Sequence, residues 1–182
     1  MNGQVPDHDA ADIRIRPIRL DDLDAFRAMR IEAVRACPLA FTADLAATEA
    51  RSIDEWRAQL ARSTGDGRDV IMLADAGPAG LAGMTGVFTI DQPKLAHVGS
   101  VWGVYVRPPF RGRGVGERLL RACVDWAGEN GRVTLKLSVV AGNDAARRCY
   151  ERVGFTAYGV EPLAVQWDGQ LHDEILMVLR LR

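Results

Sequence analysis

The stretch "RGRGVGERLLRACVDWA", residues 111–127, decides how the chain around it folds. Its second part repeats apolar side chains three and four residues apart, and this period predicts a helix over 114–128. The residues before it, "AHVGSVWGVYV" at 96–106, are rich in valine and aromatic residues and predict a strand, which Pro108 and Pro109 end. A loop with the glycines Gly112, Gly114 and Gly116 therefore connects a strand to the start of a helix.

This loop has the features of an anion site. The first amide groups of a helix lack partners within the helix, and the helix dipole adds partial positive charge at the same end. Glycine leaves no Cβ between those amides and a phosphate, and Arg111 and Arg113 can add charge-assisted hydrogen bonds. The alternative is a tight turn before a helix, with both arginines in solvent.

The residues around the loop exclude two common nucleotide sites. A dinucleotide fingerprint needs glycine at position 117, where this chain has Glu117, and no acidic ribose partner follows at a suitable spacing. A triphosphate loop needs lysine directly after Gly116, and Glu117 stands there as well. A ligand with a pyrophosphate and no metal requirement is therefore favoured, and no metal site is expected.

The rest of the chain predicts an α/β protein in which one sheet carries helices on both faces. Asp21 can cap a helix over 22–36, Ser52 and Glu55 form a capping box for the next helix, and 37–50 reads as a loop or broken helix. Asn143 and Gly154 bound a short helix. Strands are expected at 12–20, 69–75, 81–90, 133–140 (with Val133, Leu135, Leu137 and Val139 on one face) and 155–160, and in the segment "HDEILMVLRL" after the turn at 168–169.

Composition points to one cytoplasmic domain over 12–182, preceded by a disordered tail at 1–11. The chain has 182 residues, 48% of them hydrophobic and 26% charged, and a net charge of -1. That charge draws it neither to nucleic acid nor to a membrane, and no signal peptide or long apolar run is present. Cys37, Cys123 and Cys149 lack metal or redox spacing and are interpreted as reduced thiols.

Two segments carry a resemblance to a known family. "YVRPPFRGRGVGERLL" resembles the acyl-CoA-binding motif [RQ]-x-x-G-x-[GA] of the GNAT superfamily of N-acetyltransferases, and "VVAGNDAARRCYERVGF" is similar to its N-x-x-A-x-x-x-Y-x-x-x-G-F segment. The resemblance is specific over 98–158 and general over 12–181. The matching residues are Arg111, Gly114 and Gly116 in the first motif, and Asn143, Ala146, Tyr150, Gly154 and Phe155 in the second.

The resemblance implies a mixed, mostly antiparallel seven-stranded sheet whose parallel central pair, 98–106 and 133–140, splays apart. It implies that acetyl-CoA binds in that gap and that a primary amine attacks it directly in a ternary complex. Tyr150 would protonate the departing thiolate; the alternative is a half-buried core tyrosine with a hydrogen-bonded hydroxyl. The residues assigned to acetyl-CoA are Val104, Tyr105, Val106, Arg111, Gly112, Arg113, Gly114, Val115, Gly116, Asn143 and Ala146.

The base that takes the proton of the amine is not determined by the motifs. Many members of the superfamily carry a glutamate on the strand before the loop, whereas 98–106 has no carboxylate here. Glu161 is the first candidate for the base, with a solvated loop carboxylate as the alternative interpretation. His97 and a water held by Ser100 or by a backbone carbonyl are the other candidates.

The acceptor is expected to be a small-molecule or peptide amine, bound by segment 36–50, the strand around Trp102 and a loop at 160–170. Phe41, Trp102, Leu163 and Trp167 would supply apolar contacts, and Glu161, Asp44 and Glu49 could attract a cationic amine. Two other functions stay open: an acyl-CoA-binding sensor or partner-binding module without turnover, and a protein that binds another nucleotide. Oligomeric state is open too, a homodimer through the last strands being an ordinary arrangement.

Overall fold

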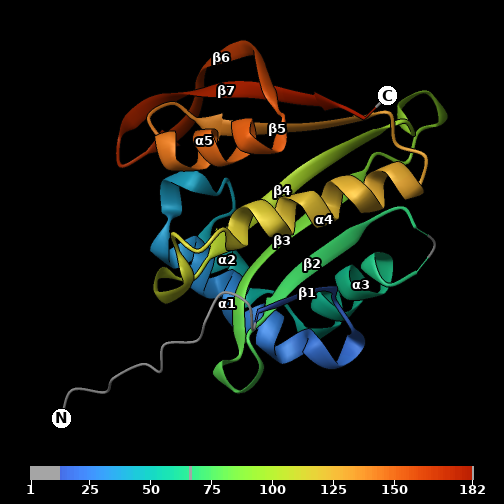
Figure 1. Cartoon of the computed structure of the whole chain (residues 1–182). Helices are drawn as coiled ribbons and strands as arrows, with labels where there is room; N and C mark the ends of the chain where they lie inside the picture. The colour runs from blue at the N-terminus through green and yellow to red at the C-terminus, as the bar shows by residue number, and fades with distance from the viewer. Residues whose placement is uncertain (1–12, 66, 182) are drawn as a thin grey trace.

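The fold is a seven-stranded sheet in a computed structural model that describes residues 13–65 and 67–181 (Figure 1). The strands are β1 (Arg14–Pro17), β2 (Val70–Asp75), β3 (Leu81–Thr89), β4 (Val98–Val106), β5 (Thr134–Val140), β6 (Thr156–Trp167) and β7 (Gln170–Arg180). Their order across the sheet is β1-β2-β3-β4-β5-β7-β6. Among the described residues, β4 and β5 are the one pair of strands that run parallel. The predicted mixed, mostly antiparallel sheet is therefore confirmed, and the predicted tail at 1–11 lies outside the described residues.

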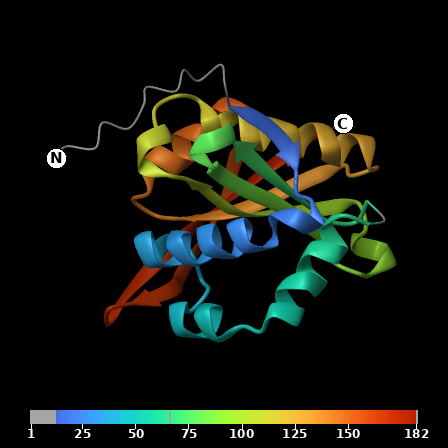
Figure 2. The ribbon, with the colours of Figure 1, turned by 90° about the horizontal axis from the view of Figure 1, so that it is seen from below.

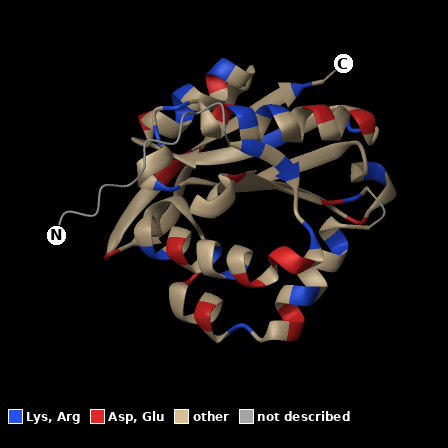
Figure 3. Ribbon diagram, turned by 60° about the horizontal axis from the view of Figure 1, so that its bottom comes forward, with Lys and Arg blue, Asp and Glu red and all other residues tan. Residues whose placement is uncertain are grey.

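Helices cover both faces of the sheet, as predicted (Figure 2). They are α1 (Leu23–Ala36), α2 (Leu45–Ala50), α3 (Ile53–Ser63), α4 (Val115–Glu129) and α5 (Asp144–Val153). The apolar stripe of α4 packs on one face, and the stripes of α1 and α3 pack on the other. Burial of these stripes is the main force that joins the layers. Figure 3 shows positive and negative residues interspersed along the helices of both faces.

Each helix begins and ends where local chemistry allows it. The capping box of α3 is formed as predicted, because the Ser52 hydroxyl accepts from the Glu55 amide and the Glu55 carboxylate accepts from the Ser52 amide. In α5 the Asn143 side chain accepts from the Ala146 amide, and Gly154 ends the helix at φ 111°. None of the helices in the described chain combines the length and the apolar character that crossing a bilayer requires.

β4 and β5 pair for only part of their length. Register partners join Val98–Ser100 to Thr134–Lys136, and beyond Ser100 the two strands diverge (Figure 1). β5 continues along β7 up to Val140, while β4 stays with β3. β4 also carries a bulge, in which Gly103 takes φ 68°. The backbone of β4 that faces the opening therefore has no strand partner, which confirms the predicted splayed pair.

The last hairpin differs from the prediction of a loop at 160–170. β6 continues through this segment to Trp167 and pairs with β7, so the predicted loop is wrong. The physical reason is Pro162: proline interrupts the ladder of a central strand and therefore predicts an end to the strand. Here β6 is the edge strand, and a register shift between Glu161 and Val165 accommodates the proline.

Two smaller expectations also fail. Asp21 does not cap α1, because a 3-10 turn over Leu20–Asp22 precedes that helix and the Asp22 carboxylate accepts from the Arg19 amide instead. Val133 does not face the core of the sheet: β5 begins at the next residue, and Val133 is 44% exposed. Both errors lie at element ends, where pairing with a neighbouring segment decides the boundary.

Candidate active site

The glycine loop presents open backbone at the start of α4. Gly112 and Gly114 take φ values of 75° and 72°, which disfavour other residues, and a Cβ at either position would meet no atom within 4 Å. Gly114 is the N-cap of α4 and provides no capping side chain. The amides that follow it therefore lack a side-chain cap, and the space in front of the loop is free for an anion.

The charged residues beside the loop are held in place. The Arg111 Nε donates to the Val106 carbonyl at 2.9 Å, and its guanidinium carbon lies 5.9 Å from the ring centroid of Tyr105. Glu117, whose charge would oppose an anion, is bound by Arg121 at 2.8 Å and by Arg152 at 3.2 Å. These hydrogen bonds lower the pKa of the Glu117 carboxyl. Its negative charge is therefore balanced.

A cleft of about 410 Å³ joins the two predicted motifs. It runs from the glycine loop along β4 to the start of α5. Of the eleven residues assigned to acetyl-CoA, ten line it: Val104, Tyr105, Val106, Arg111, Gly112, Gly114, Val115, Gly116, Asn143 and Ala146. Arg113 of the loop does not. The sequence motifs therefore meet at one cleft because α4 and α5 both begin at the open end of the β4–β5 pair.

Tyr150 lies in a smaller and more enclosed cavity of about 110 Å³. This cavity shares Val104, Asn143 and Ala146 with the cleft, so the two are adjacent. Phe41 and Trp102, the predicted acceptor contacts, line it together with Tyr150. The structure thus brings the expected cofactor residues, the expected acid and two expected acceptor residues to one place.

The environment of Tyr150 favours the protonated phenol. The residue is 7% exposed, and its ring contacts Phe155 edge to face with centroids 6.3 Å apart. Burial raises its pKa above the ordinary value. Within the described chain the Tyr150 hydroxyl donates no hydrogen bond. The alternative interpretation, a core tyrosine with a hydrogen-bonded hydroxyl, finds no side-chain or backbone partner for that hydroxyl among the described residues.

A carboxylate that the sequence analysis missed lines the same small cavity: Glu174 of β7. It is half-buried and stands opposite Glu161 in the β6–β7 register. No motif surrounds Glu174 in the sequence. Its position follows from the pairing of β7 with β5 and β6, which a strand pattern alone does not specify.

The other predicted base candidates lie elsewhere. Glu161 is exposed on the edge strand and does not line the small cavity. His97 precedes β4 at the closed end of the β4–β5 pair, where its carbonyl accepts from the amide of Val133. Ser100 belongs to the last paired position before the strands diverge. Neither residue lines the cavity of Tyr150.

The remaining predicted acceptor residues do not line the cavity of Tyr150. Leu163 and Trp167 are 62% and 48% exposed on the β6–β7 hairpin and line none of these cavities. Asp44 caps α2 by accepting from the Ala47 amide, and Glu49 pairs with Arg35.

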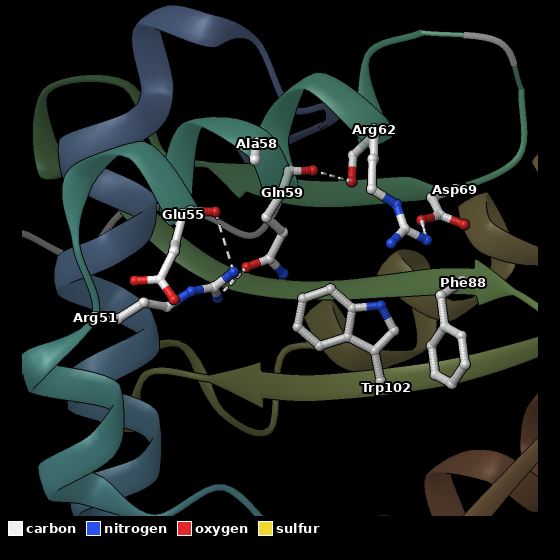
Figure 4. A pocket seen from close by; sticks show the side chains of 9 residues that line it. Arg51, Glu55, Ala58, Gln59, Arg62, Asp69, Phe88 and Trp102 are labelled. Carbon is white, nitrogen blue, oxygen red and sulfur yellow. Dashed lines mark hydrogen bonds and ion pairs between the residues drawn. The ribbon is translucent and has the colours of Figure 1, made fainter.

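A third cavity, of about 590 Å³, lies on the face of the sheet that α3 covers (Figure 4). Trp102 and Phe88 project from β4 and β3 on one side, and charged residues of the α3 region lie on the other. Its charged and amide residues are Arg51, Glu55, Gln59, Arg62 and Asp69. Trp102 also lines the cavity of Tyr150, so the two spaces have this residue in common. Sequence reasoning found only Trp102 of this set.

Cys149, next to Tyr150 in the sequence, is not activated as a nucleophile. Its Sγ would lie 3.5 Å from a Cβ at Gly116, where α5 approaches α4 closely. Burial raises the pKa of the Cys149 thiol, although Arg152 lowers it in part. A protonated thiol is a poor nucleophile, so an acyl-cysteine route has no support in this geometry.

Comparison with known proteins agrees with these observations. The model of the Acetyltransferase (GNAT) family matches residues 35–155. The chain is 30% identical over 138 residues to an uncharacterized N-acetyltransferase of Archaeoglobus fulgidus, which covers 76% of this chain and 89% of that protein. It is 40% identical over 79 residues to mycothiol acetyltransferase of Mycobacterium avium, covering 40% of this chain and 24% of that protein. The chain thus spans about a quarter of the length of that relative.

Solved structures show the same fold at lower identity. A GNAT-family acetyltransferase from Streptococcus pneumoniae superposes with a TM-score of 0.82 at 19% identity, over 92% of this chain and 98% of that one. A phosphinothricin acetyltransferase from Sinorhizobium meliloti, solved in complex with acetyl-CoA, superposes with a TM-score of 0.80 at 16% identity, over 93% of this chain and 88% of that one. Because the family match spans the sheet opening and both motifs, this chain belongs to the GNAT family of acetyltransferases.

Proposed function

We propose that this protein transfers the acetyl group of acetyl-CoA to a primary amine by direct attack in a ternary complex. The observation that carries the proposal is the continuous path from the glycine loop to Tyr150. The cleft at the loop and the small cavity of Tyr150 share Val104, Asn143 and Ala146. Relatives named as N-acetyltransferases support the same class of reaction.

The chain offers suitable groups for each part of acetyl-CoA. The open amides between Gly112 and Gly116 would hold the diphosphate, where a side chain in place of either left-handed glycine would intrude. The peptide-like pantetheine arm would pair with β4 beyond Ser100, where the strand has no partner on the β5 side. Acetyl-CoA supplies the activated acetyl group as a thioester.

In the transfer step the amine nitrogen forms a bond to the acetyl carbonyl carbon, and the carbon–sulfur bond breaks. The sulfur takes the phenolic proton of Tyr150, and a base takes the extra proton of the nitrogen. The raised pKa of Tyr150 keeps that proton in place until charge develops on the sulfur. Glu161 stays a candidate for the base, but Glu174 is the stronger one because it lines the cavity of Tyr150.

The test is an acetyl-transfer assay on a panel of amines that follows thiol release, run beside acetyl-CoA binding by calorimetry. We expect binding and amine-dependent thiol release together. The absence of a carboxylate from β4 favours a second function, an acyl-CoA-binding module without turnover. That function predicts acetyl-CoA binding with no thiol release for any amine, and this result would contradict the transferase.

A further inference from the structure

The guanidinium of Arg30 is buried beside the acceptor cavities without an anionic partner. Its Cζ lies 4.8 Å from the ring centroid of Phe41 and 5.3 Å from that of Trp102, two rings that line the cavity of Tyr150. Its Nη1 is buried and has no hydrogen-bond partner. No carboxylate of the described chain forms an ion pair with it.

Such a charge is costly unless something offsets it. Burial, and then repulsion from Arg51, lower the pKa of Arg30 to about 10, so the group is still charged at neutral pH. The two aromatic rings offset part of the cost through their π faces. Arg107, by contrast, is part-buried and paired with Glu32 at 2.8 Å. The site of Arg30 is therefore built around a cation and lacks the matching anion.

Arg51 adds a second cation at the larger cavity, which Trp102 also lines. Its Nη1 donates to the Gln59 Oε1 at 2.6 Å and its Nη2 to the Glu55 carbonyl at 3.1 Å, while its Cζ lies 4.5 Å from the Trp56 ring. These neutral partners hold the guanidinium in position at the edge of the larger cavity (Figure 4). Within the described chain, it too forms no ion pair with a carboxylate.

The acidic residues nearby are occupied. The Glu55 carboxylate accepts from the Ser52 amide at 2.8 Å as part of the capping box. Asp69 pairs with Arg62 at 2.9 Å and accepts from the Thr89 amide. The region around Trp102 therefore carries two cations that have no carboxylate partner within the described chain: Arg51 lines the larger cavity, and Arg30 lies behind the rings of Phe41 and Trp102. The carboxylate of Glu174 lies in the cavity of Tyr150.

We propose that the acceptor is a small molecule carrying a carboxylate as well as its primary amine, and that Arg30 and Arg51 bind the carboxylate beside Trp102. The inference rests on the proposed function and adds its substrate class. A zwitterion would lie with its carboxylate at the two arginines and its ammonium group toward Glu174 and Tyr150. This charge order would place the nitrogen where the acetyl group arrives, and Trp102 and Phe41 would contact the apolar part.

The experiment compares each of the common L-amino acids with its own α-amide as acceptor, by kcat/KM at saturating acetyl-CoA. The amide keeps the amine and the side chain and loses the negative charge; because it also lowers the pKa of the amine, both rates are expressed per neutral amine. We expect the wild type to prefer the acid at least about tenfold for its best acceptor, the range of a charge-assisted hydrogen bond. In Arg30→Met and Arg51→Met we expect this ratio to fall toward one, through loss of the rate with the acid.

Arg57→Met is the matched control, because Arg57 is an exposed arginine of α3 that pairs with Asp54 and does not line the cavity. It removes the same charge and should keep the wild-type ratio. A purely structural role of Arg30 would lower both rates equally and leave the ratio unchanged. If Arg30→Met does not fold, the acid-to-amide ratio of Arg51→Met alone tests the proposal, since the Arg51 side chain lies at the edge of the cavity.

Two results overturn the inference: the amide is the better acceptor, which would point to a peptide N-terminus, or the ratio persists in both variants. A protein that binds acetyl-CoA but acetylates no amine would refute the proposed function instead. In that case calorimetric titration of the CoA-bound protein with the same acids and amides decides whether the arginines bind a carboxylate. Equal affinity of the protein for acid and amide would then rule out a carboxylate site at these arginines.

Discussion

The phenol of Tyr150 is buried, has a raised pKa and donates no hydrogen bond within the described chain. It lies where two cavities meet. At the scale of single residues, this is the combination that a proton donor needs, because the proton stays bound until a stronger base forms next to it. Asn143 and Ala146 on the same helix line both cavities and keep the approach to the phenol open.

Tyr150→Phe should lower kcat about a hundredfold or more while leaving the Kd of acetyl-CoA within about twofold, since only the donor is removed. Stopped-time thiol release and calorimetry measure the two quantities. Tyr158→Phe, at a tyrosine 54% exposed on β6, should change neither. A large rise in the Kd for Tyr150→Phe would make Tyr150 a structural residue.

Glu174→Gln should reduce kcat/KM most at low pH and less at high pH, because an amine that is already neutral needs no base. The matched variant is Glu161→Gln, at the carboxylate opposite it in the register. A full pH–rate profile for both distinguishes them. If Glu161→Gln loses activity and Glu174→Gln does not, the base is the exposed carboxylate.

At the scale of elements, the junction of β4 and α4 depends on two left-handed glycines. Gly114→Ala should weaken acetyl-CoA binding strongly, since a methyl group would intrude on the open space in front of the amides. Gly131→Ala provides the control: its φ is 76°, close to the 72° of Gly114, and its Cβ also meets open space. Both variants should lose about 1 kcal/mol of stability or somewhat more from backbone strain. Equal acetyl-CoA affinity in the two variants would contradict the anion site.

A second element-scale feature is the connection that Arg16 makes between β1, β2 and the turn before α1. Arg16 binds Asp22 at 2.7 Å and Asp75 at 2.8 Å. Its hydrogen bonds lower the pKa of both carboxyls below the ordinary 3.8.

Because these pKa values are lower in the folded chain, the unfolded chain takes up protons first as the pH falls. The contribution of these two ion pairs to the free energy of unfolding should therefore be fully present above about pH 4 and should decline as the pH falls below it. Urea denaturation midpoints measured across this pH range give the slope of stability against pH. Arg16→Met should make this slope smaller. A slope that is the same in the variant would assign the acid sensitivity to other carboxyls.

At the scale of the whole molecule, the opening between β4 and β5 divides the sheet into two parts that acetyl-CoA would bridge. Acetyl-CoA at about a hundred times its Kd should raise the free energy of unfolding by about 2.7 kcal/mol. ADP, which offers a diphosphate without pantetheine, should raise the melting temperature less at equal concentration. Equal shifts from both ligands would support a protein that binds another nucleotide.

The sequence by itself determined most of the helices and strands and the glycine loop, because these depend on short-range periods, caps and glycine spacing. α4 and its loop, α5 between Asn143 and Gly154, and the capping box of α3 all stand where local patterns predicted them. Only the tertiary structure brought Glu174 to Tyr150 and Arg30 to Trp102, and only it extended β6 past Pro162. The physical reason is that strand register and helix–sheet packing join segments far apart in the chain, and no local pattern encodes such partners.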